Sequence, residues 1–254
     1  QFIVLRDMLL VGGWVHHILH SFPQLCHLAE EDLVPTIIAI VVVIRLIEVG
    51  AELFEFCDLD FQAMLPARTP RTHRGEIQTS SLPAEAIDTT FRLFRAALGP
   101  LEESGKLGYV LFQFAPWVRF APERLAYLEQ LPARLPGWRV AVEFRDRSWF
   151  PDHGDETLAV LRRTGLAHVV VDAPGAARAV PRVVARTART GVFRLHGRNA
   201  EGWLRQLRGE EPAVREKYDY LYSEAELREL QPDIEGLASE DGEVFVSFNN
   251  NNRD

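Results

Sequence analysis

Cysteine is scarce in this sequence. The chain has 254 residues and two cysteines, Cys26 and Cys57. Two cysteines cannot form a framework of disulfide bridges, and a chain of this length does not need one to fold. No secretory signal pattern opens the sequence. We therefore expect a reducing, cytoplasmic location.

Long apolar runs and an excess of positive charge are also missing. The longest apolar run, Leu33 to Ile44, ends at Arg45 and contains Pro35. It is shorter than the ~20 residues that cross a bilayer, so we expect a buried strand there and no membrane partner. The net charge is -8, which excludes a broad basic surface for a nucleic-acid backbone. Any anion site must be local.

The remaining composition is that of a folded domain. Hydrophobic residues make up 47% of the chain and charged residues 25%, which excludes a disordered tail, a collagen-like fibre and a low-complexity linker. At this length one large α/β barrel is as good an expectation as two smaller domains.

The second half of the sequence repeats one pattern, a short β-branched or aromatic run followed by a turn and an amphipathic helix. The first four runs start roughly one βα unit of ~30 residues apart. This alternation predicts a parallel sheet covered by helices. The five predicted strands cover residues 110–114, 139–144, 168–172, 192–196 and 243–248.

The predicted helices carry their own boundary signals. Ser223 and Glu226 have the spacing of a capping box, and Gly165 is a predicted C-terminal cap. Gly99 is expected to follow the end of an earlier helix. The apolar stripe of that earlier helix consists of Ile87, Phe91, Phe94 and Leu98.

Each predicted strand ends with polar residues on one face, because alternate residues of a strand share a face. Polar side chains that converge at the carboxyl ends of several strands are typical of a TIM barrel. No glycine-rich phosphate motif follows a strand, which disfavours a nucleotide-binding open sheet. We therefore predict a TIM-barrel-like (β/α) barrel forming a single domain. The converging residues are Gln113, Glu143, Arg145, Asp172, Arg194, His196 and Asn249.

Several segments resemble, in order and spacing, the YecE-like family, known as domain of unknown function 72. The resemblance covers about residues 80 to 250 and implies a TIM-barrel-like fold. It implies no reaction, because the family has no established biochemical activity. The matching segments are Gln113-Phe-Ala-Pro116, Val142-Glu-Phe-Arg-Asp-Arg-Ser-Trp-Phe150, Val171-Asp-Ala-Pro174, Arg194-Leu-His-Gly-Arg198 with Trp203, Tyr218-Asp-Tyr-Leu-Tyr-Ser223 and Phe248-Asn-Asn250.

The first third of the chain departs from this family. Eight strands make a barrel, so three should precede residue 109. Only two apolar runs are found there, Ile3 to Val11 and Thr36 to Val49, and the third strand would fall at Met64 to Thr72, where two prolines oppose it. We expect residues 1–80 to be divergent, 81–254 to be family-like, and the barrel to be irregular or incomplete at both ends. Divergence, a frameshift or a sequence error would each give this pattern.

The converging side chains favour a site for an anionic substrate. Arginine guanidinium groups are suited to phosphate or carboxylate. Either Glu143 or Asp172 is the predicted general base and His196 the general acid, for hydrolysis or isomerisation of a phosphorylated compound or cleavage of a nucleic-acid strand. The expected partner is a small anion or single-stranded nucleic acid. The predicted binding residues are Gln113, Arg145, Arg194, Arg198, Trp149, Trp203, Tyr220, Asn249 and Asn250.

Aromatic residues follow the same strand ends. Aromatic rings beside arginines can stack on bases or sugars. The alternative is that they pack as loops over the end of the barrel. These residues are Trp149, Trp203, Tyr218, Tyr220 and Tyr222.

A non-catalytic barrel that binds a ligand or a partner protein is the main alternative. Inward carboxylates need partners, and a structural network would pair Glu143 with Arg145 or Arg194, and Asp172 with His196. A cavity at the strand ends would favour a site instead.

Two further chemistries stay open. Glu143, Asp172 and His196 could hold a divalent metal, although nearby arginines oppose it, and His16, His17 and His20 are a weak zinc pattern. Glycoside cleavage would need Glu143 and Asp172 to lie about 5–5.5 Å or about 6.5–9.5 Å apart. Ser148 lies in no nucleophile elbow, which disfavours a serine triad.

Overall fold

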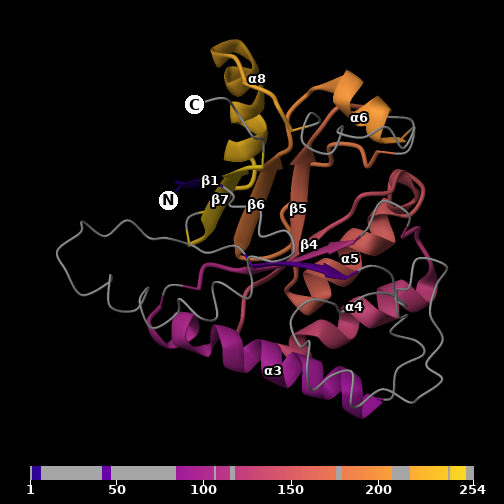
Figure 1. Ribbon diagram of the computed structural model, residues 1–254, viewed down its shortest axis with the longest axis vertical. Coiled ribbons are helices and arrows are strands. Elements are labelled where there is room, and N and C mark those ends of the chain that lie inside the picture. The colour runs from indigo at the N-terminus through magenta and orange to yellow at the C-terminus, as the bar shows by residue number, and fades with distance from the viewer. Residues whose placement is uncertain are drawn as a thin grey trace.

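A computed structural model of the chain describes residues 2–6, 42–46, 84–105, 107–114, 118–175, 179–207, 218–239 and 241–249 (Figure 1). Within these ranges seven strands form one sheet in the order β1-β7-β6-β5-β4-β3-β2, and every neighbouring pair is parallel. The predicted α/β class is therefore confirmed. The strands are β1 (Phe2–Arg6), β2 (Val42–Leu46), β3 (Val110–Phe114), β4 (Val140–Glu143), β5 (Ala167–Asp172), β6 (Thr190–Leu195) and β7 (Glu243–Phe248).

Helices lie between the strands from β3 to β5 and between β6 and β7, as the repeating pattern predicts, but no described helix connects β5 to β6. Figure 1 shows α3, α4 and α5 in the lower part of the view and α6 and α8 in the upper part. None of the described helices is long and apolar enough to cross a bilayer. Their bounds are α3 (Ala84–Glu103), α4 (Pro122–Arg134), α5 (Gly154–Thr164), α6 (Ala200–Leu207) and α8 (Glu224–Glu235), with a 3-10 turn η2 (Arg147–Trp149).

Two predicted helix boundaries are confirmed and one is wrong. Ser223 and Glu226 form the capping box of α8, and Gly165 ends α5 with a φ of 70°. The helix expected to stop at Gly99 continues to Glu103. Pro100 lacks the amide hydrogen that a helix interior uses, yet its carbonyl accepts from Ser104. Partly buried Leu101 extends the apolar face of this helix, so packing outweighs the local stop signal.

Both faces of the sheet are buried, and their residues alternate as predicted. One face, which we call the outer face, packs Phe112, Phe114 and Val142 with residues of α3, α4 and α5. Further along the sheet the same face packs Val170, Phe193 and Leu195 with Leu230 of α8. The opposite face, the inner face, consists of Tyr109, Leu111, Ala141, Val169, Val192 and Phe245.

The two N-terminal strands overlap the two apolar runs of the sequence. Phe2 of β1 pairs with Val244 of β7, and Val42 of β2 pairs with Val110 of β3. The third strand expected at 64–72 lies outside the described residues. So do His16, His17, His20 and the predicted binding residue Asn250.

Candidate functional site

Polar side chains collect on the inner face at the carboxyl ends of β3, β4, β6 and β7. Each follows an apolar inner-face residue by two or four positions, as Glu143 follows Ala141, so strand alternation directs it to the same side. All six are at most 8% exposed. We call them the inner-face cluster: Gln113, Glu143, Arg145, Arg194, His196 and Asn249.

Glu143 is the centre of this cluster. Its Oε1 atom accepts hydrogen bonds from Arg145 Nη1 at 3.0 Å and His196 Nε2 at 3.1 Å, and its Oε2 atom accepts from Arg194. Burial by itself raises the pKa of the carboxyl group, but the neighbouring charges and hydrogen bonds of Arg194, His196 and Arg145 hold that pKa well below its usual value. Glu143 is therefore ionised. The predicted pairing with Arg145 or Arg194 is confirmed for both.

His196 links Glu143 to Asn249. Burial lowers the pKa of the imidazole to about 4, so the ring is neutral near pH 7. Because Nε2 faces an ionised carboxylate, Nε2 carries the single proton, and Nδ1 accepts from Asn249 Nδ2 at 2.7 Å. Among the described residues, neither Asn249 Oδ1 nor the buried Ser247 Oγ two residues earlier on β7 has a hydrogen-bond partner.

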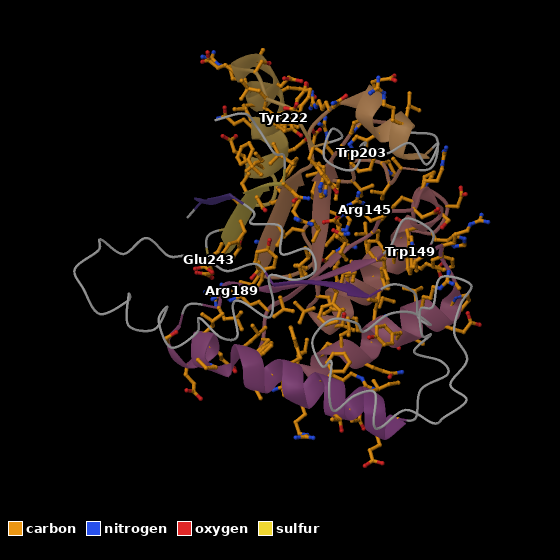
Figure 2. The ribbon with its side chains drawn as sticks, viewed as in Figure 1. Arg145, Trp149, Arg189, Trp203, Tyr222 and Glu243 are labelled. Carbon is orange, nitrogen blue, oxygen red and sulfur yellow. The ribbon has the colours of Figure 1, made fainter. Side chains whose placement is uncertain are left out.

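Arg145 and Gln113 are the cluster members most open to solvent, at 8% exposed each. The Arg145 guanidinium lies over the ring of Trp203, 5.3 Å from its centroid, and Figure 2 shows the two side chains close together. The Trp203 ring in turn packs edge-on against the ring of Tyr218, with 6.1 Å between the two ring centroids. Among the described residues Arg145 donates one hydrogen bond, to Glu143, so most of its five N–H groups have no acceptor in this part of the chain.

Asp172 lies on the other face of the sheet, which corrects the predicted convergence. It follows Val170, an outer-face residue packed near Tyr222, and accepts a hydrogen bond from Tyr222 at 2.7 Å. The predicted pairing of Asp172 with His196 is therefore wrong. Strand alternation puts Asp172 on the same face as Val170. Because Val170 is apolar, this pairing was the sequence signal that Asp172 faces the helices.

Arg198 also reaches the outer face, because the chain turns at Gly197, whose φ is 81°. The guanidinium binds both oxygens of Asp172, at 2.9 Å and 3.0 Å, and also Glu229 of α8. Hydrogen bonds to Asp172 and Glu229 raise the pKa of Arg198. Arg198 is thus engaged by carboxylates, which corrects its predicted place beside Arg145 and Arg194.

Arg182 completes this second set of charges, and sequence reasoning missed it because its segment has no periodic pattern. It donates to Asp172 at 3.0 Å and to Glu229 at 3.2 Å, and pairs with Asp233 at 3.1 Å. Burial and the charge of Asp172 raise the pKa of the Tyr222 hydroxyl. We call this set the outer-face network: Asp172, Arg182, Arg198, Tyr222, Glu229 and Asp233.

Most of the predicted aromatic residues pack within the protein. Trp149 is fully buried, donates to the Val118 carbonyl at 2.9 Å and stacks on Phe114. Its predicted place in a loop open to a ligand is therefore wrong. Tyr220 donates to Glu226 and packs edge-on against Tyr222. Trp203 is the predicted aromatic binding residue that contacts the inner-face cluster.

The structure does not assemble the predicted metal or glycosidase sites. In the described part of the chain no group of three or more His, Cys, Asp or Glu side chains is placed to hold a metal ion. Glu143 and Asp172 lie on opposite faces of the sheet, so they cannot act on one glycosidic bond. Ser148 Oγ accepts from the Phe120 amide at 2.8 Å.

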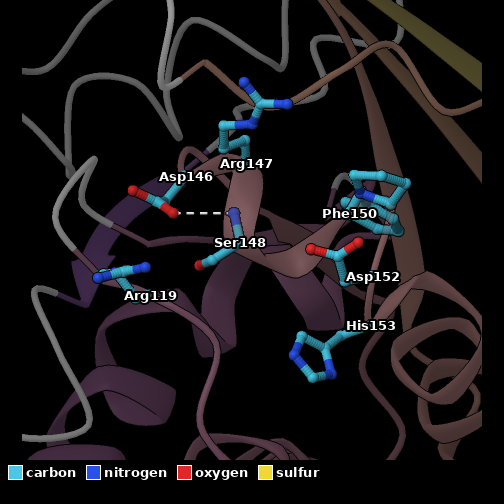
Figure 3. A pocket seen from close by; sticks show the side chains of 8 residues that line it. Arg119, Asp146, Arg147, Ser148, Phe150, Asp152 and His153 are labelled. Carbon is cyan, nitrogen blue, oxygen red and sulfur yellow. Dashed lines mark hydrogen bonds between the residues drawn. The ribbon is translucent and has the colours of Figure 1, made fainter.

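A separate cavity of about 550 Å³ opens beside the segment after β4 (Figure 3). It shares no lining residue with the inner-face cluster, and sequence reasoning did not identify it. Asp146 and Ser148 form the hydrogen bond drawn in Figure 3. The lining residues are Arg119, Asp146, Arg147, Ser148, Phe150, Pro151, Asp152 and His153.

Comparison with known proteins supports the family resemblance. Residues 57–254 match the model of a family described as protein of unknown function DUF72. The UPF0759 protein YunF of Bacillus subtilis (strain 168) is 34% identical, and the match covers 76% of each chain.

Two solved structures are also similar. A DUF72 family protein of Thermotoga maritima MSB8 has a TM-score of 0.64 at 25% identity, covering 98% of this chain and 77% of that one. A DUF72 family protein of Enterococcus faecalis V583 has a TM-score of 0.59 at 30% identity, covering 65% and 60%.

Proposed function

The chain belongs to the DUF72 family, a family of unknown function, and we propose that it binds a small anionic ligand at the inner-face cluster. The observation that carries this proposal is the state of Arg145. Arg145 is 8% exposed as a residue, its guanidinium lies over the Trp203 ring, and among the described residues it donates one hydrogen bond. A nearly buried, permanently charged group with unused donors is suited to a phosphate or carboxylate.

The surroundings of Arg145 strengthen an interaction with an anion. The inner-face cluster holds the positive charges of Arg145 and Arg194 against the single ionised carboxylate of Glu143, so a net positive charge remains for an anion. In this nearly buried environment a charge pair is stronger than in water. Trp203 covers one face of the guanidinium, which leaves its edge for a ligand. Gln113, with the same exposure as Arg145, supplies a neutral amide at the same rim.

Acid–base catalysis by Glu143 and His196 is a second candidate, favoured by the hydrogen bonds from Glu143 through His196 to Asn249. However, both pKa values lie well below neutrality. A general base is most effective with a pKa near the working pH. Binding is therefore the better-supported function, and hydrolysis of a bound phosphate ester or nucleic-acid strand is the further activity to test.

We also infer that the sheet closes into a TIM-like barrel. All neighbours in the strand order are consecutive in the chain, apart from β1 beside β7, and this is the order of a barrel interrupted between β1 and β2. In such barrels ligands bind at the carboxyl ends of the strands, where the inner-face cluster lies. A cytoplasmic location is part of the same proposal.

The test is a panel of anions with two matched variants. Wild-type protein is titrated calorimetrically with inorganic phosphate, propyl phosphate, acetate and a thymidine oligonucleotide. Arg145→Gln is expected to weaken binding of the bound anion by about tenfold or more, because a charge-assisted hydrogen bond contributes about 1.5–3 kcal/mol.

Arg119→Gln is the control, since Arg119 lines the separate cavity and the substitution removes the same charge. This variant is expected to bind like the wild type. Loss of binding in Arg119→Gln with unchanged binding in Arg145→Gln would place the ligand in the cavity and refute the proposal.

A further inference from the structure

We infer that the cavity beside the segment after β4 binds a free α-amino acid with an apolar side chain. This site is separate from the inner-face cluster and does not depend on the anion proposed there. Its basis is a cavity of about 550 Å³ that is lined by unused hydrogen-bond donors as well as unused acceptors.

Two opposite charges line this cavity without a partner. Arg119 and Asp152 are both exposed. In the described part of the chain their side chains make no hydrogen bond or ion pair, either with each other or with a third group. Figure 3 shows them on opposite sides of Ser148. A ligand that carries both a carboxylate and an ammonium group forms a charge-assisted hydrogen bond with each.

Two neutral groups of the lining have spare hydrogen-bonding capacity. Ser148 Oγ accepts from the Phe120 amide at 2.8 Å, so its own proton remains to be donated. His153 Nδ1 lies 2.6 Å from Glu156 Oε1. Because a carboxylate requires a donor, Nδ1 of the neutral ring carries the proton and Nε2 is an acceptor. Ser148 thus supplies a donor for a ligand carboxylate, and His153 an acceptor for an ammonium group.

The lining segment is held in place before any ligand binds. Trp149, in the middle of this segment, is fully buried and donates to the Val118 carbonyl at 2.9 Å. The His153 ring stacks on Phe120 with 3.7 Å between ring centroids. A site that is already ordered loses little conformational entropy on binding.

The balance of charge selects a zwitterion over a simple anion. The lining contains two arginines and two aspartates, so an anion attracted by the first pair is repelled by the second. Phe150 and Pro151 add carbon surface to the same cavity. Ligand pockets commonly measure about 300–1,000 Å³, so this cavity has room for an amino acid together with an apolar side chain.

The experiment compares leucine with two analogues that each lack one charge. Leucine, 4-methylpentanoate without the ammonium group and 3-methylbutylamine without the carboxylate are titrated calorimetrically into wild-type protein. Leucine is expected to bind, and each analogue to bind at least about fivefold more weakly, because an ion pair that is open to solvent contributes up to about 1 kcal/mol. Arg119→Gln and Asp152→Asn should each weaken leucine binding by a similar factor.

Arg92→Gln and Asp155→Asn are the matched controls. They remove the same charges at exposed positions that do not line the cavity, and they should keep the wild-type affinity for leucine. No leucine binding, or binding that both Arg119→Gln and Asp152→Asn leave unchanged, would overturn the inference. Leucine binding that is lost only in Arg145→Gln would belong to the inner-face cluster, which would overturn this inference and leave the proposed function standing.

Discussion

The inner-face cluster and the outer-face network contain similar residues and differ in how completely these are satisfied. In the outer-face network two arginines face Asp172, Glu229 and Asp233, and Arg198 binds Asp172 through two nitrogens. In the inner-face cluster Arg145 and Arg194 share one carboxylate with His196. Among the described residues, two buried oxygens have no hydrogen-bond partner in or next to the inner-face cluster, Asn249 Oδ1 and Ser247 Oγ.

This difference is the basis on which we assign the outer-face network a structural role and propose a binding role for the inner-face cluster. The outer-face network joins the end of β5 and the turn after β6 to α8, and its arginines are matched by acidic groups. The inner-face cluster retains donors on Arg145 and an acceptor on Asn249. Arginines near strand ends therefore indicate a ligand site only when the surrounding carboxylates do not already occupy them.

Removing the charge of Glu143 should produce the largest loss of stability. Glu143→Gln leaves Arg194, which is 1% exposed, without its buried counter-charge. Breaking a buried pair in this way costs about 3–5 kcal/mol. Urea denaturation at neutral pH measures the loss.

Glu229→Gln is the comparison variant on the outer-face network. Glu229 is solvent-exposed, so its ion pairs are screened and weak, and the urea midpoint should hardly change. Equal losses from the two substitutions would contradict the distinction between the two regions.

Acid should destabilise the protein through its buried histidines. Burial lowers the pKa of both His196 and His168 to about 4, whereas in the unfolded chain they bind a proton near pH 6.5. The unfolded state therefore takes up more protons between these values, and stability falls as pH drops from about 6.5 to about 4. Each histidine should account for roughly 3 kcal/mol.

His168→Phe distinguishes the two contributions. The His168 ring lies beside Phe144 and Phe150 on the outer face. Phenylalanine therefore keeps these ring contacts and removes one titrating group, at the loss of the hydrogen bond between Nε2 and the Val183 carbonyl. About half of the pH dependence should remain, and it belongs to His196 of the inner-face cluster. A flat stability profile in this variant would show that His196 does not titrate as we expect.

Asp172→Asn should have a smaller effect, roughly 2 kcal/mol, measured by the same denaturation. It weakens the hydrogen bonds with Arg182, Arg198 and Tyr222, but the two arginines keep Glu229 and some access to solvent. Anion binding at Arg145 should be unchanged. A loss of anion binding in Asp172→Asn would mean that the two faces of the sheet do not act separately.

Much of the second half of the fold follows from the sequence. The run 243–248 is rich in β-branched and aromatic residues and is a strand over the same residues, and Ser223 with Glu226 starts α8 as predicted. These features depend on local chemistry. The end of α3 depended on tertiary packing at Leu101, so a local signal at Gly99 misled the prediction.

The candidate site was predicted in part for the same reason. Strand alternation correctly grouped Glu143 with Arg145 and Arg194 with His196. It could not show that Tyr222 and Arg182, distant in the sequence, would satisfy Asp172 on the other face. Trp149 lies in a polar segment, but η2, capped by Asp146, turns its ring into the core.

The pairing of β1 with β7 has a consequence for synthesis on the ribosome. Phe2 finds its partner only at Val244, so β1 cannot join the sheet until nearly all of the described chain has emerged. During elongation the first strand has both backbone edges open to other chains, and contacts at such large sequence separation form slowly. The protein therefore has a vulnerable interval between the synthesis of β1 and that of β7, in which a holding chaperone would protect β1 from aggregation.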